Sequence, residues 1–167
     1  DCGECGGDNS NCDVIVSFGD INGNAGTVEI FMENNVPVAG FQFTITDDPD
    51  IINIINVSGG LAEEYGFMMD YLSSGIVLGF SLTGATIPEG ENVLIVVDFY
   101  YEIDTEIELC LNEVIFSSAE GDALSLAVED CAIMTHSEEC DLGDLNEDGY
   151  LDILDIVLII NFILGQQ

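Results

Sequence analysis

The feature of this sequence that most restricts its fold is a series of short apolar runs filling residues 13–135, with clusters of Gly, Asn, Asp or Pro between them. In several runs apolar and polar residues alternate, as where Phe41, Phe43 and Ile45 are separated by Gln42 and Thr44. Successive side chains of a strand point to opposite faces, so this period of two is typical of a strand with one buried face. Many such strands joined by turns indicate a mainly β protein with a β-sandwich fold.

The runs define the strands that we expect. They cover residues 14–18, 28–32, 41–46, 51–57, 76–82, 93–101, 107–111, 114–116, 124–128 and 132–134. The run at 93–101 is apolar on both faces, as a central strand can be, and residues 61–65 suggest a single helical turn. A zone of about 120 residues is large enough to bury a core of its own.

The charge of the chain excludes several function classes. Its 167 residues include no Lys or Arg but 33 Asp and Glu, for a net charge of −33. Nucleic acids and anionic membranes are bound through basic side chains, so neither is an expected partner. With 48% hydrophobic residues the chain is not a disordered acidic protein. We expect bound cations or external salt to offset the repulsion among its acids.

Cysteine use indicates an oxidising, extracellular location. The six cysteines are Cys2, Cys5, Cys12, Cys110, Cys131 and Cys140. An even count favours disulfides over a zinc site begun by Cys2 and Cys5, because a second pair of ligands at zinc spacing is missing. We expect Cys110 to pair with Cys131, since both flank apolar strand-like runs, and the N-terminal three to share bonds with Cys140 or another chain. The start at Asp1, without a basic signal segment, is as expected of a mature secreted protein.

A calcium-binding loop is predicted near the C-terminus. Oxygen-bearing side chains occupy positions 1, 3, 5, 9 and 12 of a twelve-residue loop, and Gly149 occupies position 6, where the chain must turn sharply. The predicted ligands are Asp144, Asn146, Asp148, the carbonyl of Tyr150, Asp152 and Asp155. Position 12 is Asp rather than the Glu of an EF-hand, which implies a slightly different loop geometry. The alternative is an acidic turn that caps a helix.

An apolar helix is expected directly after this loop. Asp152 can cap its start and Gly165 can end it. The segment is apolar nearly all round, so it requires partner surfaces on several sides. The expected assembly residues are Ile156, Val157, Ile160, Phe162 and Ile163. The run from 153 to 164 is too short to cross a bilayer, which takes about 20 residues. Whether the helix docks on its own sandwich or on another copy stays open.

Two known families resemble parts of this chain. Residues 143–165, GDLNEDGYLDILDIVLIINFILG, resemble one repeat of a dockerin, whose loop ends in Asp and leads into an apolar helix. Residues 27–45, TVEIFMENNVPVAGFQFTI, and residues 81–102 resemble early and middle strands of cohesin-like, jelly-roll sandwiches, and residues 114–128 resemble their end. Residues 1–12 resemble a Cys/Gly-rich spacer of multidomain secreted bacterial proteins.

The resemblance implies a domain organisation and a mode of assembly. A Cys/Gly-rich segment at 1–12 precedes a cohesin-like sandwich at 13–135, a link at 136–142 and a dockerin-like loop and helix at 143–167. Cohesins bind dockerins through contacts that depend on calcium, so extracellular assembly is implied, with the six loop residues as ligands. Dockerins normally carry two repeats packed helix against helix, whereas this chain has one. The missing surface could come from the same chain or from the next.

Several weaker signals have simpler explanations beside them. Asp20, Asn22 and Asn24 could form part of a second metal loop or a plain turn between strands. Asn56 begins a glycosylation sequon. The sole histidine, His136, lacks the nucleophile and acid that catalysis would require. The tyrosines at 65, 71, 100 and 101 could stack on sugars or pack within the sheet.

The expected function is therefore non-enzymatic. We expect a secreted, calcium-binding structural protein that assembles head-to-tail, through copies of itself or a cohesin/dockerin-type partner, into a filament or matrix. The alternatives are a monomeric module for cell-surface attachment or carbohydrate binding, and a glycosidase-like enzyme with two close carboxylates in a cleft.

Overall fold

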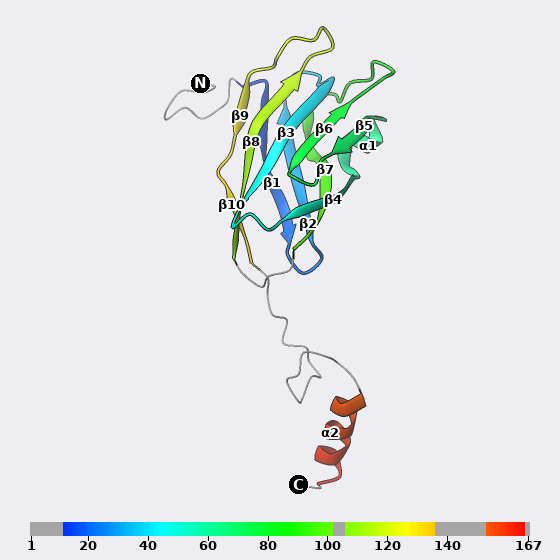
Figure 1. The fold of residues 1–167 in the computed structure, drawn as a ribbon. Coiled ribbons are helices and arrows are strands. Elements are labelled where there is room, and N and C mark those ends of the chain that lie inside the picture. Colours follow the sequence, from blue (N-terminus) through cyan, green and yellow to red (C-terminus); the bar gives the residue numbers. More distant parts are fainter. Residues whose placement is uncertain (1–11, 102–105, 136–152, 166–167) are drawn as a thin grey trace. The chain divides into compact units, whose positions relative to one another are not determined.

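The computed structural model describes residues 12–101, 106–135 and 153–165. The chain divides into two compact units, Asp1–His136 and Ser137–Gln167. The described part of the first unit contains the strands and a short helix, and that of the second contains helix α2 (Figure 1). Each unit is considered by itself.

The first unit is a sandwich of two five-stranded sheets (Figure 1). The β1 sheet has the order β4-β7-β2-β1-β9, and the β3 sheet has the order β10-β8-β3-β6-β5. The strands of the β1 sheet are β4 (Asn53–Ser58), β7 (Gly90–Tyr100), β2 (Thr27–Asn34), β1 (Val14–Asn22) and β9 (Leu126–Val128). Those of the β3 sheet are β10 (Ala132–Met134), β8 (Ile107–Ser117), β3 (Gly40–Asp48), β6 (Ile76–Phe80) and β5 (Met68–Tyr71). The pairs are antiparallel, apart from the parallel pairing of β1 with β9.

The mainly β fold predicted from the alternating pattern is confirmed. The runs expected at 107–111 and 114–116 form one strand, β8, which continues through a bulge. Strand β5 was not predicted, because its residues, MMDY, show no clear alternation of apolar and polar side chains. The helical turn expected at 61–65 corresponds to α1 (Gly60–Glu64).

Helix α1 packs closely against β7. Gly60 has a φ of +63°, and a methyl group at this position would lie 2.4 Å from the carbonyl oxygen of Leu94. A residue with a Cβ would be disfavoured by both the left-handed backbone and this close approach. Glycine therefore allows the short helix to lie on the neighbouring strand.

The core lies between the inner faces of the two sheets. Phe41, Phe43 and Ile45 of β3 are buried, as their alternation predicts. The ring of Phe41 lies 6.0 Å from that of Phe43, 6.2 Å from that of Phe67 and 6.1 Å from that of Phe116, between centroids. Aromatic pairs at such separations add to the stabilisation that burial of their apolar area supplies. The β1 sheet contributes Val14, Val16, Val28, Ile30, Met32, Leu94, Ile95 and Val97.

Cross-links join strands at two sides of the sandwich. The expected disulfide between Cys110 of β8 and Cys131 beside β10 is confirmed. At the other side, the hydroxyl of Tyr71 in β5 donates to the carbonyl oxygen of Ile55 in β4, which ties the two sheets together. Cys12 is also disulfide-bonded. Because the two other described cysteines pair with each other, its partner lies outside the described residues.

The described part of the second unit is helix α2 (Ile153–Ile163). It ends at Ile163, and Gly165, where the end was expected, follows with a φ of +66°, as is typical just beyond a helix C-terminus. Its described apolar side chains are exposed, from 39% for Leu158 to 73% for Ile163. Among the residues that the structure describes, no helix has the length and apolarity needed to cross a membrane.

Candidate functional site

The outer face of the β3 sheet carries exposed apolar side chains. The alternation that buries Phe41 and Phe43 turns Gln42 outward, where it lies between Leu78 of β6 and Ile115 of β8. Ile115 is 52% exposed and Leu78 36% exposed. This sheet is the nearer one in Figure 1, with β8, β3, β6 and β5 side by side.

Two further apolar side chains extend this surface towards the edge of the sheet. Met68 of β5 is paired with Phe80 of β6, so both lie on the same outer face as Leu78. Met68 is 52% exposed and Phe80 is half-buried. We call Met68, Leu78, Phe80 and Ile115 the outer apolar patch. Exposed apolar side chains gathered on one sheet face, with polar residues such as Gln42 among and around them, are a feature of protein-interaction sites.

Polar side chains border the patch on β3 and β8. Asn112 donates from Nδ2 to Thr46 Oγ1 at 2.7 Å, and Thr44 Oγ1 donates to Glu113 Oε2 at 3.3 Å. Glu113 lies in the bulge of β8 and has a φ of +49°. The border is therefore made of hydroxyls, an amide and a carboxylate that strand pairing holds in place.

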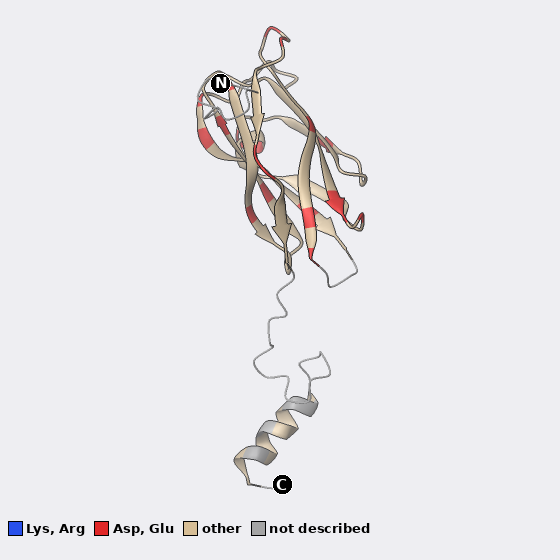
Figure 2. Cartoon of the chain, turned by 90° about the vertical axis from the view of Figure 1, so that its left-hand side faces the viewer, with Lys and Arg blue, Asp and Glu red and all other residues tan. Residues whose placement is uncertain are grey.

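Acidic residues occupy the far end of the same face. Asp48 and Glu108 are directly opposite each other across β3 and β8, and both are exposed. Figure 2 shows acidic residues on strands and loops throughout the first unit, and the chain has no Lys or Arg to pair with them. Like charges opposite each other destabilise a sheet, so this end of the face favours cations or hydrogen-bond donors.

The edges of the two sheets are poorly suited to pairing with another chain. Strands β9 and β10 have three residues each and β5 has four. Strand β4 is interrupted by a register shift between Ile54 and Asn56. Short and bulged edge strands are how natural sheets avoid edge-to-edge association. The face of the β3 sheet is therefore a better docking surface than any sheet edge in the described part of the chain.

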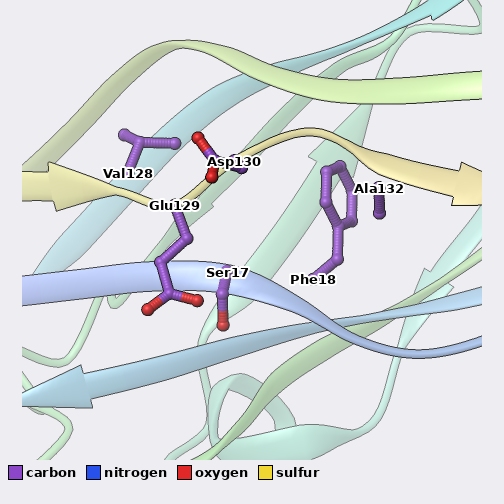
Figure 3. Close-up of a pocket in the computed structure, with 6 residues that line it drawn as sticks. All are labelled: Ser17, Phe18, Val128, Glu129, Asp130 and Ala132. Carbon is purple, nitrogen blue, oxygen red and sulfur yellow. The ribbon is translucent and has the colours of Figure 1, made fainter.

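A shallow hollow of about 470 Å³ lies where the chain passes from β9 to β10 (Figure 3). It is lined by Ser17, Phe18, Val128, Glu129, Asp130 and Ala132. Glu129 extends past Ser17, whereas the carboxylate of Asp130 points away from it (Figure 3). Glycosidases need two carboxylates that converge on one bond. These two side chains do not converge, so the hollow gives no support to the glycosidase alternative.

The predicted calcium ligands Asp144, Asn146, Asp148, Tyr150 and Asp152 lie outside the described residues. Asp155 falls within α2, and its side chain is not described. His136, Cys2, Cys5 and Cys140 also lie outside. The calcium site therefore remains a prediction based on the spacing of its oxygen ligands, and so does the role of Phe162, whose side chain is not described.

Asp20 and Asn22 lie at the end of β1, and Asn24 lies in the turn that joins β1 to β2. Asn22 Oδ1 accepts a hydrogen bond from the backbone N–H of Ala25, three residues on, at 2.9 Å. In the described ranges, no three His, Cys, Asp or Glu side chains lie close enough to hold a metal. The turn accounts for the position of Asn22, and metal binding here remains an untested prediction.

The remaining predicted sites lie on the surface. Asn56 is exposed on β4, and its Nδ2 donates to Asp98 Oδ2 at 2.8 Å. Tyr65, Tyr71 and Tyr101 pack against the core, and of these three Tyr71 lies in a strand, β5. Tyr100 is 54% exposed on the β1 sheet. The described tyrosines therefore do not gather into one flat platform for sugars.

Sequence reasoning did not find the outer apolar patch or the bulge at Glu113. Leu78 belongs to a predicted strand, but which of its faces is covered depends on the second sheet. Met68 belongs to a strand that lacks the alternating pattern. A left-handed conformation is usually signalled by Gly or Asn, and residue 113 is neither.

Comparisons with known proteins identify the fold. No protein-family model and no curated protein matches the chain. Among solved structures, the non-cellulosomal cohesin of the hyperthermophilic archaeon Archaeoglobus fulgidus has a TM-score of 0.57 at 17% identity, over 76% of this chain and 94% of that one. CaCohA2 from Clostridium acetobutylicum has a TM-score of 0.55 at 19% identity, over 75% and 91%.

A third solved structure agrees with these two. The sixth cohesin of scaffoldin B from Acetivibrio cellulolyticus, in complex with the Cel5 dockerin, has a TM-score of 0.56 at 17% identity, over 73% of this chain and 97% of that one. At these identities the likeness concerns the fold alone. The first unit of this protein is a cohesin-like β-sandwich.

Proposed function

We propose that this protein is a secreted structural module that assembles by docking helix α2 of one copy onto the outer face of the β3 sheet of the next. The observation that carries the proposal is the presence, in one chain, of two exposed apolar surfaces. One is the outer apolar patch and the other is the described surface of α2, on which Ile156 is 49% exposed and Ile160 is 47% exposed. Covering both would remove apolar area from water.

The dimensions of the two surfaces are compatible. Helix α2 has 11 residues, which corresponds to a length of about 16 Å. The four strands from β5 to β8 span three inter-strand spacings, or about 14 Å. The helix is therefore long enough to cross the strands that bear the outer apolar patch.

Calcium would bind to the loop that leads into α2. Asp144, Asn146, Asp148, Tyr150, Asp152 and Asp155 would bind Ca²⁺ through oxygen atoms, as in other twelve-residue calcium loops. The twelfth position, Asp155, is also a residue of α2. Ion binding would thus hold the loop against the first turn of the helix and lower the negative charge near the docked surface.

The proposed contact joins two different surfaces, so it is heterologous. A heterologous contact gives a ring if its rotation closes and a filament if it does not. The short and bulged edges of both sheets argue for this face-to-helix contact over strand addition. The cohesin of Acetivibrio cellulolyticus mentioned above was solved with a dockerin, so a dockerin-type segment of another protein is the alternative occupant of the face.

Two complementary variants of the full-length chain test the proposal. Ile115→Asp places a charge in the outer apolar patch, and Ile160→Asp places one in α2. With calcium, we expect the wild type to form filaments by negative-stain electron microscopy, and each variant to sediment as a monomer. A mixture of the two variants should form a heterodimer only, because one intact face and one intact helix remain. Ile55→Asp, at a position 55% exposed in the β1 sheet, is the matched control and should still assemble.

Other outcomes would contradict the proposal. If the wild type is monomeric with and without calcium, the monomeric surface-attachment module becomes the better explanation. If filaments form but tolerate Ile115→Asp, the contact uses another surface. If calcium-free filaments persist, the loop is not required for assembly.

A further inference from the structure

Glu113 has a backbone conformation that its residue type disfavours. Its φ is +49°, and it is the one non-glycine residue with positive φ in the described ranges. L-residues avoid this left-handed region because Cβ approaches the carbonyl oxygen, and glycine or asparagine usually occupies it. The position needs the left-handed backbone for the bulge of β8 but does not need a glutamate for it.

The bulge places this residue at the border of the outer apolar patch. Gln42 pairs with Ile115 and Thr44 pairs with Asn112, so the register shifts between them and the β8 strand has an extra residue there. Glu113 is exposed, and Ile115 of the patch is two residues along the same strand. Its carboxylate is therefore available to a partner that covers the patch.

The contacts of Glu113 within its own chain do not explain the glutamate. Its side chain accepts a hydrogen bond from Thr44 Oγ1 at Oε2, and at 3.3 Å this bond is long for one to a carboxylate. A carboxylate has about four acceptor sites, so most of its capacity is unused. A residue kept in an unfavourable conformation without an internal reason is a candidate for a functional contact.

Helix α2 contains a hydrogen-bond donor that would require an acceptor when the helix is covered. Its sequence, ILDIVLIINFI, has one amide side chain, that of Asn161, which is half-buried. If α2 is covered on several sides, this amide loses water and must find an acceptor, because an unpaired buried polar group is costly. Helix α2 of the next copy offers no basic side chain, since its sequence contains no Lys, Arg or His. The group that α2 of a second copy can offer to Glu113 is therefore a neutral donor, the amide N–H of Asn161.

We propose that Glu113 is the specificity-determining residue of the docking face and that its carboxylate accepts a hydrogen bond from Asn161 Nδ2 of a second copy. This inference rests on the proposed function. The pair fixes the register and direction of α2 on the sheet. Apolar contacts alone would allow several registers and both directions. A single polar residue in an otherwise apolar helix contact has this effect in coiled coils.

The heterodimer of the two complementary variants provides the binding assay. The chain with Ile160→Asp supplies the face and carries the Glu113 substitutions, and the chain with Ile115→Asp supplies the helix and carries Asn161→Leu. We expect Glu113→Gly to raise the dissociation constant roughly tenfold or more. This is the range for the loss of a hydrogen bond to a charged group. The same substitution should raise the thermal midpoint of the face chain, because glycine tolerates the left-handed backbone.

A double-mutant cycle tests the named pair. Asn161→Leu should weaken binding to the chain with Glu113, but should have little further effect on the chain with Glu113→Gly. Glu113→Gln should also weaken binding without raising stability. The matched control is Glu108→Gln, which removes the same charge elsewhere on β8 of the same face and should leave the affinity unchanged.

The outcomes separate this inference from the proposed function. If the parent pair does not associate, the proposed function fails. If the parent pair associates and Glu113→Gly leaves the affinity unchanged, or if Glu108→Gln weakens it equally, the role of Glu113 is wrong. If both single substitutions weaken binding additively, the pairing with Asn161 is wrong.

Discussion

Asp13 and Ser125 form hydrogen bonds to each other in both directions beside the parallel β1–β9 pair. The backbone N–H of Asp13 donates to Ser125 Oγ at 2.9 Å. The backbone N–H and the hydroxyl of Ser125 donate to Asp13 Oδ2 at 2.8 and 2.7 Å. The contact joins two segments 112 residues apart in the chain, so it holds the start of the sandwich to its last strands.

This contact predicts a pH dependence of stability. The side-chain and then the backbone hydrogen bond from Ser125 lower the pKa of Asp13 from 3.8, against a small opposing effect of burial. A carboxylate with a lowered folded-state pKa stabilises the fold above its unfolded-state pKa, and this stabilisation is lost as pH falls through the folded-state value. We expect Ser125→Ala to lower the thermal midpoint at neutral pH.

The difference from wild type should shrink as the pH falls below 3.8. Thermal unfolding followed by circular dichroism across this range provides the test. Asp50→Asn, which removes a charge from an exposed loop position, is the control for the general effect of charge. A difference that is independent of pH would show that Asp13 is not the titrating partner.

Gly79 is required by the ring of Phe41. A methyl group at Gly79 would lie 2.2 Å from Cζ of Phe41, on the buried side of β6. We expect Gly79→Ala to destabilise the first unit by about 1–3 kcal/mol, the range for overpacking a core. Urea unfolding measures the change.

A compensating substitution makes this test specific. Phe41→Leu removes the atoms that the methyl group would meet, so the double variant should lose less stability than the sum of the single variants. Strict additivity would instead mean that Gly79 is needed for some other reason.

Asn34 is the buried polar side chain among the described residues, at 3% exposure. Its Nδ2 donates to the carbonyl oxygens of Val36 at 2.8 Å and Pro88 at 2.9 Å. We expect Asn34→Ala to cost about 2 kcal/mol, because it leaves two carbonyls without their donor. Asn34→Asp should cost more at neutral pH, because it places a buried carboxylate against those carbonyls.

The two substitutions differ in how they respond to pH. At acidic pH the aspartic acid becomes neutral and can donate one hydrogen bond, so its excess cost should fall. Chemical unfolding at neutral and acidic pH checks this. Equal costs for both variants at neutral pH would contradict the predicted extra cost of a buried carboxylate against the two carbonyls.

Glu33 and Glu91 are directly opposite each other across β2 and β7, and both are exposed. Like charges in this arrangement destabilise a sheet, and opposite charges stabilise it. We expect Glu91→Lys to raise the free energy of unfolding by about 0.5–1 kcal/mol at low salt, with a smaller gain at high salt. Glu89→Lys changes the charge equally one residue before the strand. An equal gain from that control would assign the effect to net charge.

Calcium removal should affect the second unit rather than the first. We expect isothermal titration calorimetry of the full chain to detect calcium binding that EDTA reverses. Asp148→Ala should weaken the affinity at least tenfold, since it removes a ligand from the fifth loop position. Asp141→Ala removes an acid just before the loop and should bind normally. The absence of binding heat in the wild type, together with unchanged thermal unfolding, would contradict the calcium loop.

Local patterns in the sequence were sufficient for the elements that depend on near neighbours. Phe41, Phe43 and Ile45 predicted a half-buried strand because strand side chains alternate with a period of two. Gly165 predicted the end of α2 because a left-handed residue closes a helix. The Cys110–Cys131 disulfide was also anticipated, from two cysteines placed beside strand-like runs. The first two inferences used residues that are close together in the chain, whereas the disulfide joins residues 21 apart.

The tertiary structure alone decided which apolar side chains of the sheets are exposed. Leu78 and Val77 are adjacent and both apolar, yet Val77 is buried and Leu78 is exposed, because the β1 sheet covers only one side of β6. The unpredicted strand β5 adds Met68 to that exposed side, and the bulge opposite β3 holds Glu113 in a left-handed conformation. Strand order and register depend on contacts between distant segments. The apolar pattern by itself therefore determined a sandwich and a C-terminal helix, and packing determined which apolar side chains of the sandwich stay exposed.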